Sequence, residues 1–310
     1  MTARIISLLP AGTEIVAALG AVDQLVAITH ECDYPPEVAT LPRVTASKVD
    51  RDASSSAIDE QVRRLASTGE PIFALDADDI VRLAPTVILT QALCEVCAVS
   101  EGDVRDIAQV LSPAPAIVRL GGTTLDGVWS DIAAVGRAIG RSEQAGALLE
   151  SITARLLRVH QILKSARAPR RRIAVVEWLD PLYSAGHWTP DVIRRAGGID
   201  AIAEPGAHSV RITMEQLRAA TPEVLLFAPC GFDVERAERE ARALLATDEW
   251  SWARDLDVWA IDGNALTSRP GPRLADAVEV IAAIVAPKLF AALPEQYARA
   301  LSRASSVDSA

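Results

Sequence analysis

The first part of the chain alternates between short apolar runs and segments whose apolar residues recur with helical spacing. An apolar run at 5–9 precedes a helical segment that ends at Leu19, in which Thr13 suits the N-cap and Gly20 the helix end. Further strands are expected at 25–29, 72–76, 86–90 and 116–120, and helices at 58–67, 77–84 and 101–111. Strands that alternate with helices indicate βαβ units with parallel pairing.

A second alternating region follows a long helical stretch. Residues 125–166 contain almost no helix breakers, and their second part is long for a globular helix. Beyond them, strands are expected at 173–179, 223–229 and 258–262, and helices at 191–198, 214–220, 234–246 and 273–290. The pattern predicts an α/β protein with two Rossmann-like lobes joined by one long backbone helix. The predicted domains are an N-terminal lobe at 1–122, a connecting helical segment at 123–169, a C-terminal lobe at 170–290 and a partly disordered tail at 291–310.

Composition and charge narrow the class of partner. The chain has 310 residues, of which 50% are hydrophobic, and a net charge of -10 with a sequence pI of about 5.0. Because this field repels phosphates, nucleic acid is not an expected partner. No stretch approaches the ~20 apolar residues of a membrane span, so membrane insertion is not expected either. We expect a monomer.

The opening sequence bears on location. It reads MTARIISLLPAGTEIV, and its apolar run breaks at Pro10, which does not fit a secretory signal. The expected location is therefore the cytoplasm. If a leader was removed, the location would be the periplasm or the cell surface.

The cysteines share one kind of position. The chain has 4 of them, too few for a disulfide framework. Each follows an expected strand; they are Cys32, Cys94, Cys97 and Cys230. Since ligands sit beyond the carboxyl ends of strands in open α/β sheets, the four thiols are candidate ligands for zinc or an iron–sulfur cluster, with His30 and His187 in reserve. The alternatives are four free thiols, direct ligation of a bound cofactor, and a redox pair.

A second group of candidates follows the strand at 173–179. The sequence there reads EWLDPLYSAGHWTP, and its aromatic residues Trp178, Tyr183 and Trp188 suit a planar ligand such as a macrocycle. His187 is a candidate axial ligand to cobalt or iron. The alternative is that Trp178 packs in the core and His187 caps a turn.

Signatures of catalysis are missing from the sequence. It contains no Ser-His-Asp order, no phosphate loop and no GxGxxG fingerprint. We therefore expect no catalytic residues and a protein that is not an enzyme.

Several stretches together resemble a known family. They include RIISLLPAGTEIVAALG at the start, LVAITHECDYP, APTVILTQ, TPEVLLFAP and, near the end, NALTSRPGPRLADAVEVIAAIV. They are similar to the class III, or helical-backbone, substrate-binding proteins of ABC importers, which carry vitamin B12, haem, iron–siderophores and some bare metals. The resemblance covers nearly the whole chain, and its vitamin B12-binding branch matches best. It implies a ligand cleft between two lobes and an ABC permease partner if the protein is exported.

The resemblance adds candidate ligand contacts. Tyr34 and Gln91 lie in or beside loops that border the cleft in such proteins, and Arg269 in the SRPGPR loop could recognise a carboxylate. The leading prediction is a non-enzymatic protein that binds cobalamin, another tetrapyrrole or a metal chelate. The alternative is a cytoplasmic metal- or iron–sulfur-binding protein that uses the four cysteines for sensing or catalysis.

Overall fold

A computed structural model describes residues 2–91 and 101–302. The chain divides into two units, Met1–Ile152 and Thr153–Ala310, each with its own sheet. The predicted α/β class with two lobes is confirmed. The predicted lobe limits of 1–122 and 170–290 stay predictions.

The sheet of the first unit has four parallel strands in the order β2-β1-β5-β6. They are β1 (Ile5–Ser7), β2 (Leu25–Ile28), β5 (Val87–Gln91) and β6 (Ala116–Leu120). The apolar run of β5 is continuous because this inner strand is covered on both faces; Val87, Ile88 and Leu89 are at most 4% exposed. The carboxyl ends of these strands are therefore the edge where loops can carry functional residues.

The helices of the first unit follow the predicted alternation. They are α1 (Pro10–Ala18), α2 (Ser55–Thr68), α3 (Ala77–Leu83), α4 (Glu101–Val110) and α5 (Leu125–Ala138), with short 3-10 helices at Val22–Gln24 and Pro36–Thr40. Gly20 has a φ of 67°, which fits its predicted place after a helix end. The predicted N-cap at Thr13 is wrong. The helix begins three residues earlier, at Pro10, and the Thr13 hydroxyl lies 3.0 Å from the Cys32 sulfur.

One predicted strand has a different partner from the one expected. The segment at 72–76 contains β4 (Phe73–Leu75), which pairs antiparallel with β3 (Thr45–Ser47) in a separate ribbon. It is therefore not part of the parallel sheet.

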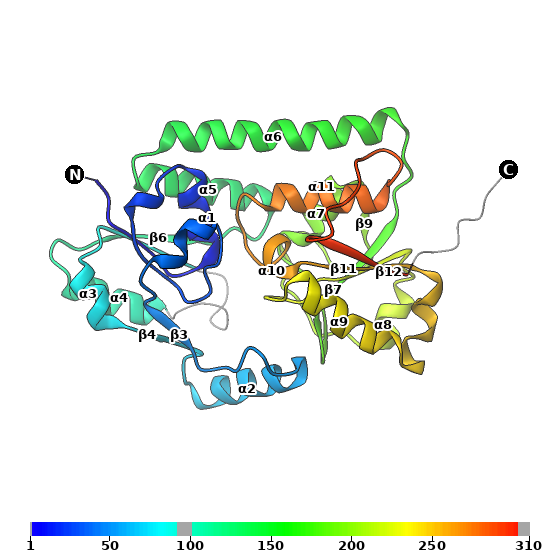
Figure 1. Cartoon of the computed structure of the whole chain (residues 1–310), viewed down its shortest axis with the longest axis horizontal. Helices are drawn as coiled ribbons and strands as arrows, with labels where there is room; N and C mark the ends of the chain where they lie inside the picture. Colours follow the sequence, from blue (N-terminus) through cyan, green and yellow to red (C-terminus); the bar gives the residue numbers. More distant parts are fainter. Residues whose placement is uncertain (1, 92–100, 303–310) are drawn as a thin grey trace. The chain divides into compact units, whose positions relative to one another are not determined.

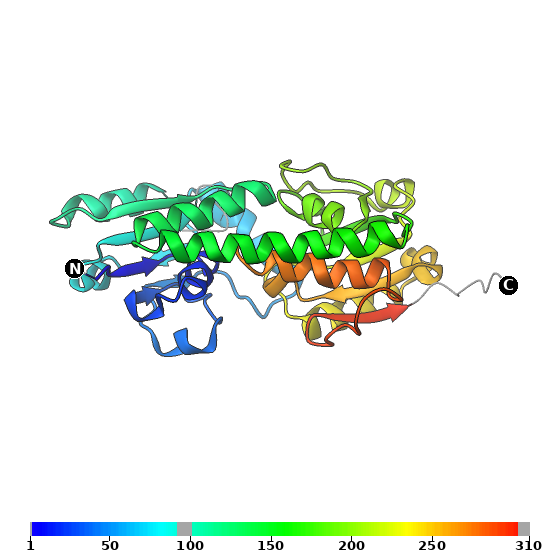
Figure 2. The same ribbon diagram turned by 90° about the horizontal axis from the view of Figure 1, so that it is seen from above.

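The long helix predicted in the middle of the chain is α6 (Ser142–Ser165), and it crosses the limit between the two units. Its second half lies beside α11 (Leu274–Val285) (Figure 2). Arg155 of α6 donates to Glu279 of α11 at 2.6 and 2.9 Å and also to Asp276. Among the described residues, no helix combines the length and apolar character that a membrane span requires.

The second unit has a mixed six-stranded sheet. Its strands are β7 (Arg172–Leu179), β8 (Leu182–Ser184), β9 (Ile199–Asp200), β10 (Val224–Phe227), β11 (Asp257–Ile261) and β12 (Ala298–Ser302). β10 lies between β7 and β11 and is parallel to both, so its four residues are fully buried. The order is β12-β11-β10-β7-β8, with β9 beside β7. Three parallel strands therefore end at one edge of this sheet.

The remaining elements surround this sheet. They are α7 (Thr189–Arg195), α8 (Met214–Ala219), α9 (Val234–Leu245), a 3-10 segment at Asp248–Asp255, α10 (Gly263–Leu266) and α11. α7 packs against α11 (Figure 1). Side chains define several helix starts: Thr213 and Gln216 form a capping box on α8, and Asp233 accepts from the Arg236 amide at the start of α9.

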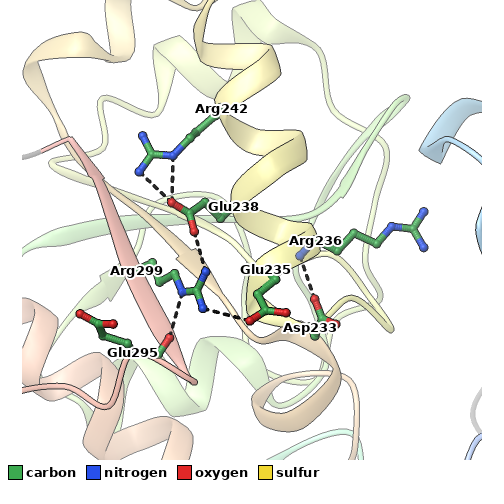
Figure 3. A network of polar contacts seen from close by, with 7 residues as sticks. All are labelled: Asp233, Glu235, Arg236, Glu238, Arg242, Glu295 and Arg299. Carbon is green, nitrogen blue, oxygen red and sulfur yellow. Dashed lines mark hydrogen bonds and ion pairs between the residues drawn. The ribbon is translucent and has the colours of Figure 1, made fainter.

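The end of the described chain contains a strand that the sequence did not predict. Within residues 291–310, where a partly disordered tail was expected, Ala298–Ser302 forms strand β12, antiparallel to β11. Its Arg299 donates to Glu238 of α9 at 2.9 Å and to Glu235 at 3.2 Å, and Glu238 also accepts from Arg242 (Figure 3). These charge-assisted bonds connect the edge strand to α9.

Candidate functional site

The candidate site lies in the second unit, at the carboxyl ends of β7, β10 and β11. Because these strands are parallel, the loops that follow them, at about 180–188, 228–233 and 262–273, leave the same edge of the sheet. A backbone bond connects the second loop to the end of β7: the Cys230 amide donates to the Glu177 carbonyl at 3.0 Å. A Cβ on Gly263 would collide with the Pro229 carbonyl, so the second and third loops are also closely packed.

An aromatic group occupies this edge. Trp178 at the end of β7 makes an edge-on contact with Phe232, with ring centroids 5.6 Å apart. Tyr183 of β8 is the cross-strand partner of Trp178. The guanidinium of Arg236 lies 3.7 Å from the centre of the Phe232 ring. Trp178 and Tyr183 are both partly exposed, so their rings retain surface for a planar apolar ligand.

Glu177 is a carboxyl group held between two loops. It accepts hydrogen bonds from the Ser209 side chain and from the Gly186 backbone amide. Desolvation raises the pKa of Glu177 to about 7, against the lowering effect of these two bonds. A large fraction of the group is therefore protonated near neutral pH, and it connects the loop after β8 with the loop that contains Ser209.

His187 has a partner that the sequence did not indicate. Its Nε2 lies 3.2 Å from Nδ1 of His208, with the two rings perpendicular. The His187 amide donates to the Ala207 carbonyl at 2.6 Å, and the Gly206 amide donates back to the His187 carbonyl at 2.9 Å. Desolvation, followed by the neighbouring His208, lowers the pKa of His187, so its imidazole is mostly neutral at pH 7.

Backbone strain accompanies this pair. His187 has a φ of 53°, in the left-handed region that few non-glycine residues adopt. A Cβ on the preceding Gly186 would collide with the Ser209 backbone, so only glycine fits there. The two segments that carry His187 and His208 are thus packed backbone to backbone.

Two other predicted ligand contacts are mostly enclosed by protein. Trp188 is 7% exposed, and its indole Nε1 donates to the Thr267 carbonyl at 2.8 Å. Arg269 is 4% exposed and donates to the Asn264 side chain at 2.8 Å. Both side chains hold the loop after β11 in place and have little surface left for a ligand. Their predicted role as ligand contacts stays a prediction.

The first unit carries the other candidates. Cys32 is 1% exposed, and Arg43 donates to its carbonyl at 2.9 Å. His30 contacts the Thr45 hydroxyl at 2.6 Å, and its pKa is lowered to about 4, mainly by desolvation and then by nearby arginines. Tyr34 is 44% exposed, and Gln91 ends β5 in a partly buried position. Tyr34 is thus the accessible residue among the candidates after β2.

The predicted four-thiol site remains a prediction. Cys94 and Cys97 lie outside the described residues. Cys32 is buried in the first unit and Cys230 is exposed in the second. Within 2–91 and 101–302, no group of three or more His, Cys, Asp and Glu side chains is arranged to hold a metal ion.

Comparison with known proteins agrees with this architecture. The family described as periplasmic binding protein matches residues 5–253. The vitamin B12-binding protein of Vibrio cholerae serotype O1 is 25% identical over 279 residues, which cover 90% of this chain and 87% of that protein. An uncharacterized ABC transporter substrate-binding lipoprotein of Bacillus subtilis is 24% identical over 294 residues, or 93% of this chain and 81% of its own length.

Solved structures show the same fold. A periplasmic haem-binding protein from Pseudomonas aeruginosa superimposes with a TM-score of 0.70 and 19% identity, covering 98% of this chain and 96% of that one. The periplasmic vitamin B12-binding protein of Vibrio cholerae gives 0.63 and 24%, with 91% and 96% covered. The resemblance that the sequence motifs predicted is confirmed, and the chain belongs to the periplasmic binding protein family.

Proposed function

We propose that this protein is the substrate-binding component of an ABC importer and that its substrate is a metal-containing macrocycle. The macrocycle is either a corrinoid such as cobalamin or another tetrapyrrole. An open metal chelate is the alternative substrate. The aromatic group at the carboxyl edge of the second sheet carries the assignment. Trp178 and Tyr183 offer partly exposed rings on neighbouring strands, and flat apolar ligands favour such surfaces. The relatives named for vitamin B12 or haem support this ligand class.

Further contacts follow from the site. His187 is proposed to approach the metal of the macrocycle, because its imidazole is mostly neutral at pH 7. Trp188 and Arg269 are proposed to act mainly by fixing the loops that carry the exposed contacts. In the first unit, Tyr34 and Gln91 are proposed as additional ligand contacts.

The partner and the location follow from the same assignment. An importer's binding protein works outside the cytoplasmic membrane and delivers its substrate to a permease. We therefore assign this protein to the periplasm or the cell surface, in place of the cytoplasm expected from the opening sequence. It is proposed to act as a monomer and to carry out no catalysis.

Spectral titration tests the assignment. The purified chain, without a histidine tag, is titrated with hydroxocobalamin and with haemin, and the absorbance change is fitted for affinity. We expect saturable 1:1 binding of at least one of them, weakened about tenfold in Trp178→Ala, which corresponds to ~1.4 kcal/mol. Trp252→Ala is the matched control, because Trp252 is a partly exposed indole that stacks on Trp250 elsewhere in the same unit.

Two results would contradict the assignment: neither compound binds, or Trp178→Ala and Trp252→Ala have the same effect. If His187→Ala leaves the absorption spectrum of the bound macrocycle unchanged, His187 is not an axial ligand.

A further inference from the structure

The pair His187–His208 has the geometry of two ligands of one metal ion. Zinc binds imidazole nitrogen at about 2.0–2.1 Å, so two nitrogens of one tetrahedral ion lie about 3.3 Å apart. Nε2 of His187 and Nδ1 of His208 are 3.2 Å apart. When no ion is bound, a hydrogen bond between the two imidazoles accounts for the same distance. A bound ion would take the place of the proton shared in that hydrogen bond.

The backbone holds both histidines in this arrangement. Two backbone hydrogen bonds join residue 187 to residues 206 and 207, one in each direction. His187 has a left-handed φ, and only glycine fits at 186. Both features fix the segment that carries His187 against the segment that carries His208. Little conformational entropy is then lost when an ion binds, which favours binding by only two protein ligands.

The carboxyl group of Glu177 supports the histidine pair. Glu177 accepts from the Gly186 amide on one side and from the Ser209 side chain on the other, so it bonds to the chain neighbour of each histidine. These two bonds support the backbone beside each histidine and so help to hold the pair in place. In the described part of the chain no third His, Cys, Asp or Glu joins the two imidazoles, so water would complete the coordination.

We infer that His187 and His208 form a binding site for a hydrated divalent first-row transition-metal ion such as Co²⁺, Ni²⁺ or Zn²⁺. Imidazole suits these ions, whereas Mg²⁺ and Ca²⁺ prefer oxygen ligands. The site shares His187 with the proposed macrocycle contact but requires His208 as a second ligand. A planar macrocycle leaves only the two opposite positions of its metal free, so two adjacent imidazoles cannot both bind it.

Cobalt(II) is the probe that tests the site. The tag-free chain is titrated with Co²⁺ and followed by its visible d–d bands, which report nitrogen and oxygen ligands, and by thiolate-to-cobalt charge transfer in the near ultraviolet. We expect one ion per chain with no thiolate band. Both His187→Ala and His208→Ala are expected to weaken Co²⁺ binding by at least ~10-fold, since each removes one of two protein ligands.

Two matched variants separate metal binding from a structural hydrogen bond. His208→Asn retains hydrogen-bonding groups near His187 but lacks the imidazole, and we expect it to lose Co²⁺ affinity as His208→Ala does. His160→Ala removes an exposed histidine of α6 and should bind as the unmodified chain does. Circular dichroism confirms that each variant is folded.

The inference is overturned by any of three results: the unmodified chain does not bind Co²⁺, His208→Asn binds it with unchanged affinity, or the bound ion shows thiolate charge transfer. The last result would assign the ion to the cysteines. Because metal alone is the probe, the outcome does not depend on whether cobalamin or haemin binds.

Discussion

The indole of Trp188 donates a 2.8 Å hydrogen bond to the carbonyl oxygen of Thr267, which joins the start of α7 to the loop after α10. Trp188 is 7% exposed, so this bond lies in a largely dry environment. A buried hydrogen bond typically contributes ~1 kcal/mol, and an acceptor left without its donor costs more.

Trp188→Phe should therefore destabilise the protein by about 1–2 kcal/mol, because the ring is largely retained while the Thr267 carbonyl loses its donor. Urea unfolding followed by circular dichroism measures the change. Trp252→Phe is the control, since the structure assigns the Trp252 Nε1 no hydrogen-bond partner. Equal losses in the two variants would mean that ring size, not the hydrogen bond, determines the effect.

Glu177 should make stability depend on pH. Its pKa is about 7 in the folded protein, against an ordinary value of 4.5, so between these values the folded protein holds a proton that the unfolded chain has released. The stabilising contribution is fully present below pH 4.5 and is lost as pH rises through 7. Glu177→Gln should flatten this dependence: the unmodified chain should lose about 2–3 kcal/mol of unfolding free energy between pH 5 and pH 8, and the variant should lose less.

Urea unfolding at several pH values between 5 and 8 checks this prediction. Glu249→Gln, an exposed substitution in the same unit, controls for the change in net charge. The prediction fails if Glu177→Gln and the unmodified chain have parallel stability profiles.

Arg155 should stabilise the packing of α6 on α11. It donates to both Asp276 and Glu279, and these bonds are the main cause that raises its pKa. Arg155→Met removes the cation and leaves two carboxylates on neighbouring turns of α11. We expect a loss of ~1 kcal/mol, modest because all three groups are partly exposed.

Thermal and urea unfolding measure the Arg155 effect. Arg158→Met, an exposed change on the same helix, should have a smaller effect on stability. A loss in Arg158→Met as large as that in Arg155→Met would indicate that helix α6 itself, rather than the ion pairs, is weakened.

Arg299 should stabilise the edge strand in a salt-dependent way. Its bonds to Glu235 and Glu238 lie at the surface, where dissolved ions screen charges (Figure 3). Arg299→Ala should lower Tm at low ionic strength, and the difference from the unmodified chain should shrink in ~1 M salt. A difference that is the same at both salt concentrations would rule out an electrostatic contribution.

Much of the fold was predictable because buried parallel strands are continuous apolar runs. The runs at 86–90 and 223–229 became β5 and β10, each an inner strand of its sheet. β12 was missed because its sequence, ARALS, is short and small. It is held by pairing with β11 and by the contacts of Arg299 with α9, which are tertiary interactions.

The site was predictable only where a residue follows a strand. Trp178, Tyr183 and His187 lie at or after the end of β7 in sequence, so the rule for open α/β sheets indicated them. His208 lies in a loop after a two-residue strand and has no such signal. Phe232 follows β10 closely, but it was overlooked beside Cys230. The partners of a loop residue depend on backbone packing, such as that around Gly186, which no periodicity encodes.

Hydrogen–deuterium exchange with and without bound macrocycle tests the central claim most directly. The chain is saturated with whichever of hydroxocobalamin and haemin binds in the spectral titration, and peptides are compared with the ligand-free protein. We predict slower exchange in residues 177–188 and 228–233, which surround Trp178 and Tyr183. Unchanged exchange in both segments, with protection elsewhere, would contradict a ligand site at the carboxyl edge of the second sheet.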